Sequence, residues 1–181
     1  MKRALVVGTA LLAMVGAAGC GENVTSPTTT LAPFVGQFSG TWSGSFLTTD
    51  VSGGECVGAD LRASGTSFDQ STINVTQKNT DVTAIVRSVT TGLTCRYDGT
   101  ASLTTFALSA VSCDEKVLFQ CSNGASRVLR PVGSTMTATQ TGERASGILT
   151  TRWNIFSADL QGEEKPVAGM TIQEQFTAIR R

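Results

Sequence analysis

Side chains that could do chemistry are few in this chain of 181 residues, because it contains no histidine. Without histidine there is no Ser-His or Cys-His pair to activate a nucleophile, and no imidazole to bind a metal. Carboxylates remain, and glycosidase-type hydrolysis needs two of them facing each other across a cleft. The adjacent pairs Asp114-Glu115 and Glu163-Glu164 lie in polar segments and are interpreted as solvated loop charge. The sequence shows no catalytic constellation, so we expect a protein that is not an enzyme and uses no cofactor.

Glu174 differs from these acids because period-two alternation over residues 170–179 places it on one face with Ile172 and Phe176. A carboxylate on an apolar face is costly to bury unless it is paired, and Arg152 is its expected partner. We interpret Glu174 either as a polar contact for a ligand or as half of a structural ion pair.

Two tryptophans, Trp42 and Trp153, lie on similar apolar faces. Core packing is the ordinary role of such residues, and lining a pocket is the alternative. The candidate ligand-binding residues are therefore Trp42, Trp153, Glu174 and Phe176.

Four cysteines beyond the N-terminal region, Cys56, Cys95, Cys113 and Cys121, predict two disulfides if the chain is exported. Of the three possible pairings we favour Cys113–Cys121, which closes a short loop, together with Cys56–Cys95, which ties a glycine-rich loop to a central strand. A zinc site is the alternative, but the close Cys-x-x-Cys pairs or histidines that zinc sites use are absent. We therefore expect no metal.

The N-terminus carries an export signal. Lys2 and Arg3 precede an apolar run over residues 4–18, which is too short to span a bilayer as a helix and is typical of a signal peptide. Its end, Ala17-Ala-Gly-Cys20, resembles the lipobox of bacterial lipoproteins. That resemblance implies cleavage before Cys20, a lipid on its thiol, and anchorage to a membrane of the cell envelope. Ordinary cleavage at an Ala-x-Ala-like site and an uncleaved anchor are the alternatives.

Domain organisation and location follow from this signal. We expect a signal peptide over residues 1–19, a lipidated cysteine and Thr/Pro-rich tether over 20–33, and one folded domain over 34–181. Gly21, in place of the aspartate that favours inner-membrane retention in enteric bacteria, indicates the outer membrane. The domain would then lie in the periplasm or at the cell surface.

Charge and composition exclude a nucleic-acid partner. The chain has 14 basic and 14 acidic residues, and loss of residues 1–19 removes Lys2 and Arg3, leaving a net charge of −2. A nucleic-acid binder would need a concentrated basic face. The expected membrane contact is therefore the lipid on Cys20 and not the domain surface.

The body of the chain reads as a series of short strands separated by turns. No segment keeps a helical period over three turns, and residues 157–167 read as a polar loop. Asp98-Gly99 is a favourable turn pair. Strands are predicted over residues 38–46, 73–77, 82–89, 94–97, 103–111, 127–132, 134–141, 147–156 and 170–179.

Eight or nine such strands predict an all-β fold, an antiparallel meander that closes into a barrel, with a β-sandwich as the alternative. Gly40-Thr-Trp42 resembles the Gly-x-Trp signature of the first strand of lipocalins, and more loosely that of avidins. The resemblance implies a barrel that can hold one small apolar ligand. The whole pattern also resembles a group of uncharacterised bacterial envelope lipoproteins.

Three classes of function follow. The favoured one is a non-catalytic, disulfide-stapled envelope lipoprotein that acts through structural or protein-interaction contacts, with a filled core. The first alternative is a lipocalin-like binder of a small apolar ligand, which predicts an empty, apolar interior. The second is a carboxylate-based hydrolase, which predicts two acids converging in a cleft with perturbed protonation.

Overall fold

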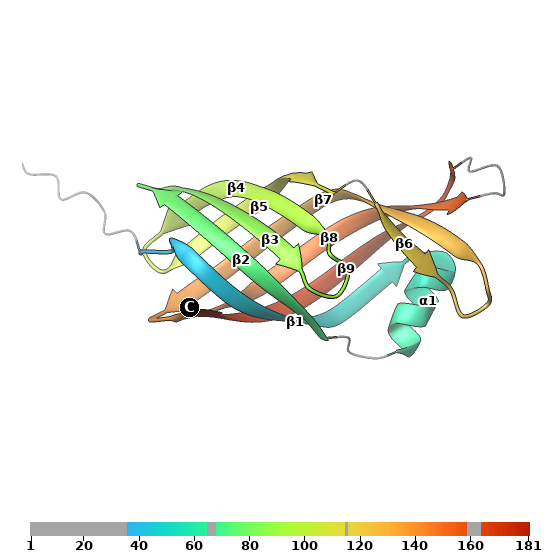
Figure 1. Cartoon of the computed structure of the whole chain (residues 1–181), viewed down its shortest axis with the longest axis horizontal. Coiled ribbons are helices and arrows are strands. Elements are labelled where there is room, and N and C mark those ends of the chain that lie inside the picture. Colours follow the sequence, from blue (N-terminus) through green and yellow to red (C-terminus); the bar gives the residue numbers. More distant parts are fainter. Residues whose placement is uncertain (1–35, 65–67, 115, 159–163) are drawn as a thin grey trace, which may run out of the picture. The chain divides into compact units, whose positions relative to one another are not determined.

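The structure of the protein is a computed structural model that describes residues 36–64, 68–114, 116–158 and 164–181. These residues form nine strands and one short helix (Figure 1). In chain order the elements are β1 (Gly40–Gly53), α1 (Glu55–Ala63), β2 (Phe68–Lys78), β3 (Asp81–Ser88), β4 (Thr94–Ser102), β5 (Thr105–Cys113), β6 (Val117–Gln120), β7 (Ser126–Thr141), β8 (Arg144–Ala158) and β9 (Glu164–Arg180). No helix in the described ranges is long and apolar enough to cross a membrane.

Eight of the strands form a closed antiparallel barrel. Sequential strands pair from β1 to β5 and from β7 to β9, β1 also pairs with β9, and β5 pairs with β7 to complete the circle. The short β6 lies outside this circle and pairs with the first residues of β7. The prediction of an antiparallel meander closed into a barrel is confirmed, and the sandwich alternative is not.

Alternation of apolar and polar side chains gives these segments their strand geometry. On β8, Leu149, Thr151, Trp153 and Ile155 are buried, and the side chains of Arg152 and Asn154 between them are exposed. Because successive strand residues point to opposite faces, this pattern turns one face of the strand into the barrel and the other to solvent.

One end of the barrel, which we call the closed end, is filled by aromatic side chains. Phe38 packs edge-on against Phe106 with ring centroids 5.3 Å apart, and the Trp42 indole N–H donates a 3.0 Å hydrogen bond to the Phe38 carbonyl. The Arg180 guanidinium lies over the Trp42 ring, 4.7 Å from its centroid, and donates to the Gln37 carbonyl. Arg180, at the end of the last strand, thus covers the side chains at the start of the first strand.

The opposite end, the open end, is built differently because four strands extend beyond the others. β1, β7, β8 and β9 have 14 to 17 residues, whereas β2 to β5 have 8 to 11. The helix α1 and the strand β6 pack on this extension, around a second core cluster that includes Val57, Leu129, Ile155 and Met170. We call α1, β6 and the loop from Cys121 to Ala125 the cap.

Several local predictions were wrong. Asp98-Gly99 is not a turn: β4 continues through it, and the chain turns at Leu103, whose φ is +46°. Gly99 serves another purpose, because a Cβ there would lie 2.1 Å from the Ala107 carbonyl oxygen on β5. Glycine here allows a close approach of two backbones, not a reversal of the chain.

Three further boundaries differ from the prediction. Residues 127–132 and 134–141 belong to the single strand β7, which carries a bulge between Pro131 and Gly133. Part of the expected polar loop over 157–167 is strand, since β8 runs to Ala158 and β9 begins at Glu164. The helix α1 was missed because nine residues are too few to display a helical period.

Candidate functional site

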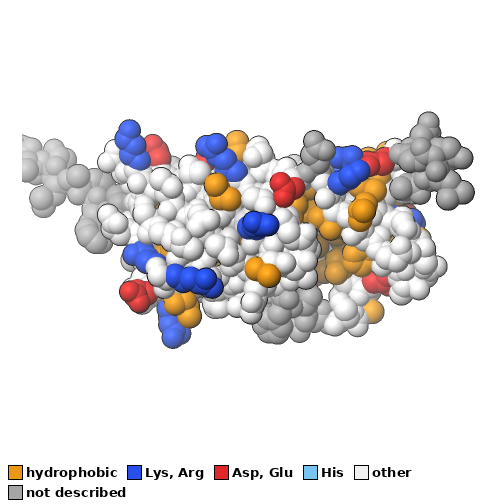
Figure 2. All heavy atoms as spheres, in the orientation of Figure 1, with side chains coloured by type: hydrophobic (Ala, Val, Ile, Leu, Met, Phe, Trp, Pro, Cys, Tyr) orange, Lys and Arg blue, Asp and Glu red, His pale blue; other side chains and the backbone are white. Residues whose placement is uncertain are grey.

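A cavity of about 340 Å³ lies inside the barrel at its open end, between the two core clusters. Exposed Thr90 and Thr91, in the turn between β3 and β4, lie on its border, so the cavity reaches the surface beside that turn. Figure 2 shows hydrophobic side chains gathered in a recess on this side of the molecule. The predicted apolar interior therefore exists in this half of the barrel.

The walls of the cavity are mainly apolar and come from the barrel and the cap. The barrel contributes Phe46, Val86, Tyr97, Leu149, Trp153 and Ile172. The cap contributes Leu61 from α1 and Val117 and Phe119 from β6. These three cap residues are half-buried, and they border the cavity together with the barrel strands.

A short polar chain crosses the interior at the cavity wall. The Tyr97 hydroxyl lies 3.0 Å from Ser134 Oγ, which lies 2.9 Å from Thr151 Oγ1. Burial raises the pKa of Tyr97; the hydrogen bond with Ser134 opposes this rise, and the charge of Glu174 adds to it. The phenol therefore stays protonated at neutral pH, and three polar groups satisfy one another inside an apolar core.

Glu174 is the most perturbed acid of the site. Burial, and secondarily the negative charge of Asp69, raise its pKa from 4.5 to about 7. Asp69 itself accepts hydrogen bonds from Ser71 Oγ (3.4 Å) and from the backbone N–H of Thr90 (3.3 Å). Both acids line the cavity.

The expected Glu174–Arg152 ion pair is wrong. In the β8–β9 register Glu174 lies opposite Leu149, and Arg152 lies opposite Thr171. Arg152 is on the outer face of β8, where its guanidinium packs near Gly133. Strand alternation therefore separates the two side chains by the full wall of the barrel.

Of the four candidate ligand residues, the structure brings two to the cavity. Glu174 and Trp153 line it, and the buried Trp153 indole N–H has no hydrogen-bond partner among the described residues. Trp42 and Phe176 do not line it, which corrects the prediction for these two. Trp42 seals the closed end, and Phe176 stacks behind Phe46 with ring centroids 5.1 Å apart.

Sequence reasoning missed Asp69, Ser71 and Tyr97 as cavity residues. Tyr97 had a usable signal, because it alternates with Cys95 on a strand and is the sole tyrosine of the chain. Asp69 and Ser71 had none, since their segment was not recognised as part of a strand.

The four cysteines form two disulfides, as predicted, but the favoured pairing of Cys113 with Cys121 and of Cys56 with Cys95 was wrong. Cys56 pairs with Cys121, with Cα atoms 5.9 Å apart, and Cys95 pairs with Cys113, with Cα atoms 4.0 Å apart. Cys95 and Cys113 are register partners on β4 and β5, so the hairpin itself brings them together. Cys56 lies on α1 rather than in a loop, and this helix packs against the turn after β6.

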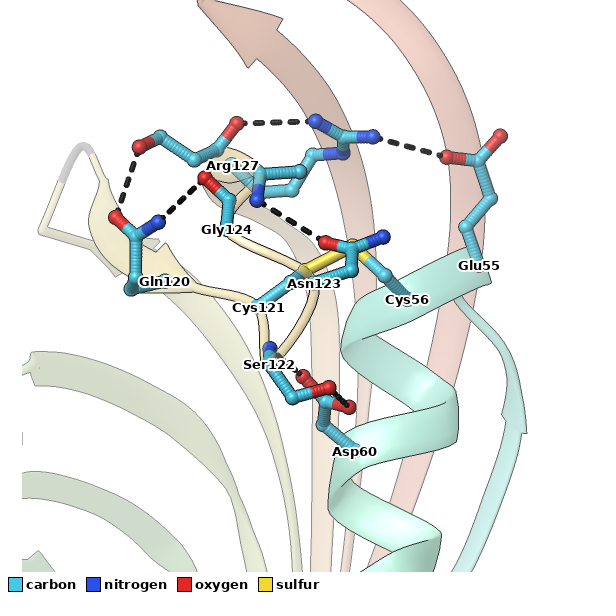
Figure 3. Close-up of a disulfide and its surroundings, with 11 residues drawn as sticks. Glu55, Cys56, Asp60, Gln120, Cys121, Ser122, Asn123, Gly124 and Arg127 are labelled. Carbon is cyan, nitrogen blue, oxygen red and sulfur yellow. Dashed lines mark hydrogen bonds and ion pairs between the residues drawn. A yellow bond between two sulfur atoms is a disulfide. The ribbon is translucent and has the colours of Figure 1, made fainter.

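Polar contacts reinforce the link between α1 and β6 (Figure 3). Asp60 accepts hydrogen bonds from the Ser122 backbone N–H (2.6 Å) and hydroxyl (2.7 Å), and these bonds lower the pKa of Asp60. Glu55 forms an ion pair with Arg127 at 3.7 Å. Within the cap, the disulfide and the Asp60 hydrogen bonds therefore hold α1 to the loop after β6, and the Glu55–Arg127 ion pair joins α1 to the barrel strand β7.

The adjacent acid pairs have structural roles where the structure describes them. Asp114 Oδ2 accepts a 2.6 Å hydrogen bond from the Thr94 backbone N–H. Glu164 accepts two hydrogen bonds from Arg130 and lies 3.7 Å from the Lys116 ammonium; the Arg130 bonds contribute most to lowering its pKa. Glu115 and Glu163 lie outside the described residues. No cluster of three or more potential metal ligands occurs in the described ranges.

Comparison with protein-family models, with curated proteins and with solved structures finds no significant match. The expected signal peptide, Cys20 and the tether all lie outside the described residues. The class of the protein is therefore stated from its own geometry: a closed eight-stranded antiparallel barrel, stapled by two disulfides, with an apolar cavity under a cap.

Proposed function

We propose that the barrel binds one small, largely apolar molecule in the cavity at its open end. The observation that carries this proposal is the unfilled volume of about 340 Å³ inside apolar walls. Small eight-stranded barrels can fill their interior with side chains, as the closed end does here. A cavity of this size falls in the range of small-molecule sites, and a ligand would restore the packing contacts that its walls forgo.

This proposal replaces a filled core as the favoured hypothesis. If the protein had only a structural or protein-interaction role, we would expect a core without a cavity. The closed end of the barrel is filled in this way, but the open end is not. The exposed Leu118 of the cap, 75% accessible, leaves room for a protein contact beside ligand binding.

A carboxylate-based hydrolase is the second candidate function. It is favoured by one observation, the presence of Asp69 and Glu174 in the same cavity with a raised pKa at Glu174. Binding is preferred because the apolar walls offer few hydrogen-bond partners to a sugar. Turnover of chromogenic glycosides or esters that disappears in Glu174→Gln would reverse this preference.

The location of the domain is part of the proposal. The lipobox-like segment supports lipidation of Cys20 and anchorage in the cell envelope, with the outer membrane favoured by Gly21. A binder held there would sample small apolar molecules that partition between the membrane and the surrounding water.

The test measures binding of the fluorescent apolar probe N-phenyl-1-naphthylamine to the unmodified protein and to a variant whose cavity is filled. Ser71→Phe adds a ring from a buried lining position on β2, and we expect it to weaken probe binding about tenfold. Thr72→Phe, on the outer face of the same strand, is the matched control and should leave the affinity unchanged. Equal affinity in both variants and the unmodified protein would place the probe elsewhere and contradict the proposal.

A further inference from the structure

The walls of the cavity carry acidic groups and no basic group among the described residues. Asp69 on β2 and Glu174 on β9 line the cavity, and neither lysine nor arginine contributes to it. Charges in such a space interact strongly, because little water screens them. The cavity therefore disfavours anions and favours cations.

Glu174 faces no neutralising charge from the strands around it. Its register partners are Thr48 on β1 and Leu149 on β8, neither of which ionises near neutral pH. In the described part of the chain, the other ionisable groups that line the cavity are the carboxylate of Asp69 on β2 and the phenol of Tyr97 on β4. Among the described residues, no ion pair or hydrogen bond to the Glu174 carboxyl is found.

The nearby charges of the cap are engaged elsewhere. Arg62 donates to the backbone carbonyls of Val51 (3.0 Å) and Gly53 (3.2 Å). Lys116, directly before β6, lies 3.7 Å from Glu164, and Asp60 accepts hydrogen bonds from Ser122. No cation of the cap therefore reaches the cavity wall in the described residues.

Aromatic rings complete the environment. Phe46, Tyr97, Phe119 and Trp153 all line the cavity. Aromatic faces attract organic cations, most strongly where water is excluded. Apolar walls, aromatic rings and two acids are together the chemistry that suits an ammonium group attached to a hydrophobic body.

From these observations we propose that the ligand is a lipophilic organic cation, whose apolar body fills the cavity and whose ammonium group lies at the Glu174 carboxylate. This inference rests on the proposed function, since it specifies the ligand of the same cavity. Protons compete with such a ligand for Glu174. Because the pKa of Glu174 is about 7, the affinity for a cation should rise as the pH increases through neutrality.

The test compares three probes with the same chain, octylammonium, 1-octanol and octanoate, by their displacement of N-phenyl-1-naphthylamine. It uses the full-length protein carrying Cys20→Ser, so that no acyl chain of its own competes for the cavity. Octylammonium is protonated at both about pH 5.5 and about pH 8.5. We expect it to bind about tenfold more tightly at the higher pH, where Glu174 is ionised. Octanol should be insensitive to pH, and octanoate should bind most weakly at the higher pH.

Glu174→Gln should abolish the rise for octylammonium and leave octanol binding intact, whereas Glu143→Gln, in the exposed turn between β7 and β8, should change neither. Two results overturn the inference but keep the proposed function: equal pH profiles for octylammonium and octanol, or tightest binding of octanoate. If neither the fluorescent probe nor any of the three compounds binds, the proposed function fails together with the inference.

Discussion

Burial of the Glu174 carboxyl costs free energy whenever that carboxyl is ionised, and the negative charge of Asp69 adds to this cost. The pKa of Glu174 is about 7 in the folded protein, against 4.5 as its ordinary value. Between these two values the folded state holds a proton that the unfolded chain has released. Stability therefore falls as the pH rises from about 4.5 to about 7, and stays at the lower level above that range.

Replacing this carboxyl by a neutral isostere should remove the penalty. We expect Glu174→Gln to raise the free energy of unfolding by about 2 kcal/mol at about pH 8, with little effect at about pH 4.5, a magnitude reduced for partial solvent access. Urea unfolding at the two pH values measures the difference. Glu143→Gln serves as the control at an exposed position. The same gain at both pH values would show that charge is not its cause.

At the scale of elements, the cap depends on the Cys56–Cys121 disulfide. This bond joins residues 65 positions apart and ties α1 to the turn after β6. Cys95–Cys113 joins residues only 18 positions apart, within a hairpin that the β4–β5 ladder already holds in register. The first disulfide therefore joins two elements that no strand ladder connects, whereas the second joins two strands that are already paired.

Removing each disulfide in turn should separate these roles. We expect Cys56→Ala with Cys121→Ala to lower the free energy of unfolding by about 4 kcal/mol, and Cys95→Ala with Cys113→Ala by about 3 kcal/mol. Amide hydrogen exchange should quicken selectively in α1 in the first double variant and not in the second. Unchanged protection of α1 in the first variant would mean that the Asp60–Ser122 and Glu55–Arg127 contacts hold the cap without the disulfide.

At the scale of the whole molecule, the two ends of the barrel differ in packing: one end is filled by side chains, and the other contains the cavity. The closed end, where Arg180 lies over the Trp42 ring, is filled by packed side chains. The open end, with its longer strands and cap, leaves the unfilled volume. We expect the anchor to act independently of this barrel, through Cys20 at the far end of the predicted tether.

Metabolic labelling with a radioactive fatty acid tests the anchor. In a bacterial host that processes lipoproteins, the unmodified chain should incorporate label and Cys20→Ser should not, because the thiol is the expected acceptor. Replacing Ser26 of the tether by cysteine in the Cys20→Ser chain is the matched control, and it should remain unlabelled. Label in Cys20→Ser equal to that of the unmodified chain would contradict lipidation at this residue.

Sequence patterns predicted much of the barrel and half of the candidate site. Alternation on residues 147–156 and 170–179 correctly placed Trp153 and Glu174 inside, since side-chain direction on a strand is a local property. The same alternation could not distinguish Trp153, on the cavity wall, from Trp42, in the packed closed end. That difference depends on which strands extend past their neighbours.

The sequence by itself determined the strand-rich fold, the inward faces of its strands, and the presence of two disulfides. These follow from local periodicity, turn chemistry and the even number of cysteines. Only the tertiary structure decided the pairing of Cys56 with Cys121, the separation of Arg152 from Glu174, and the cavity under the cap. Each of these depends on strand register and barrel closure, which bring together residues far apart in the chain and leave no period in the sequence.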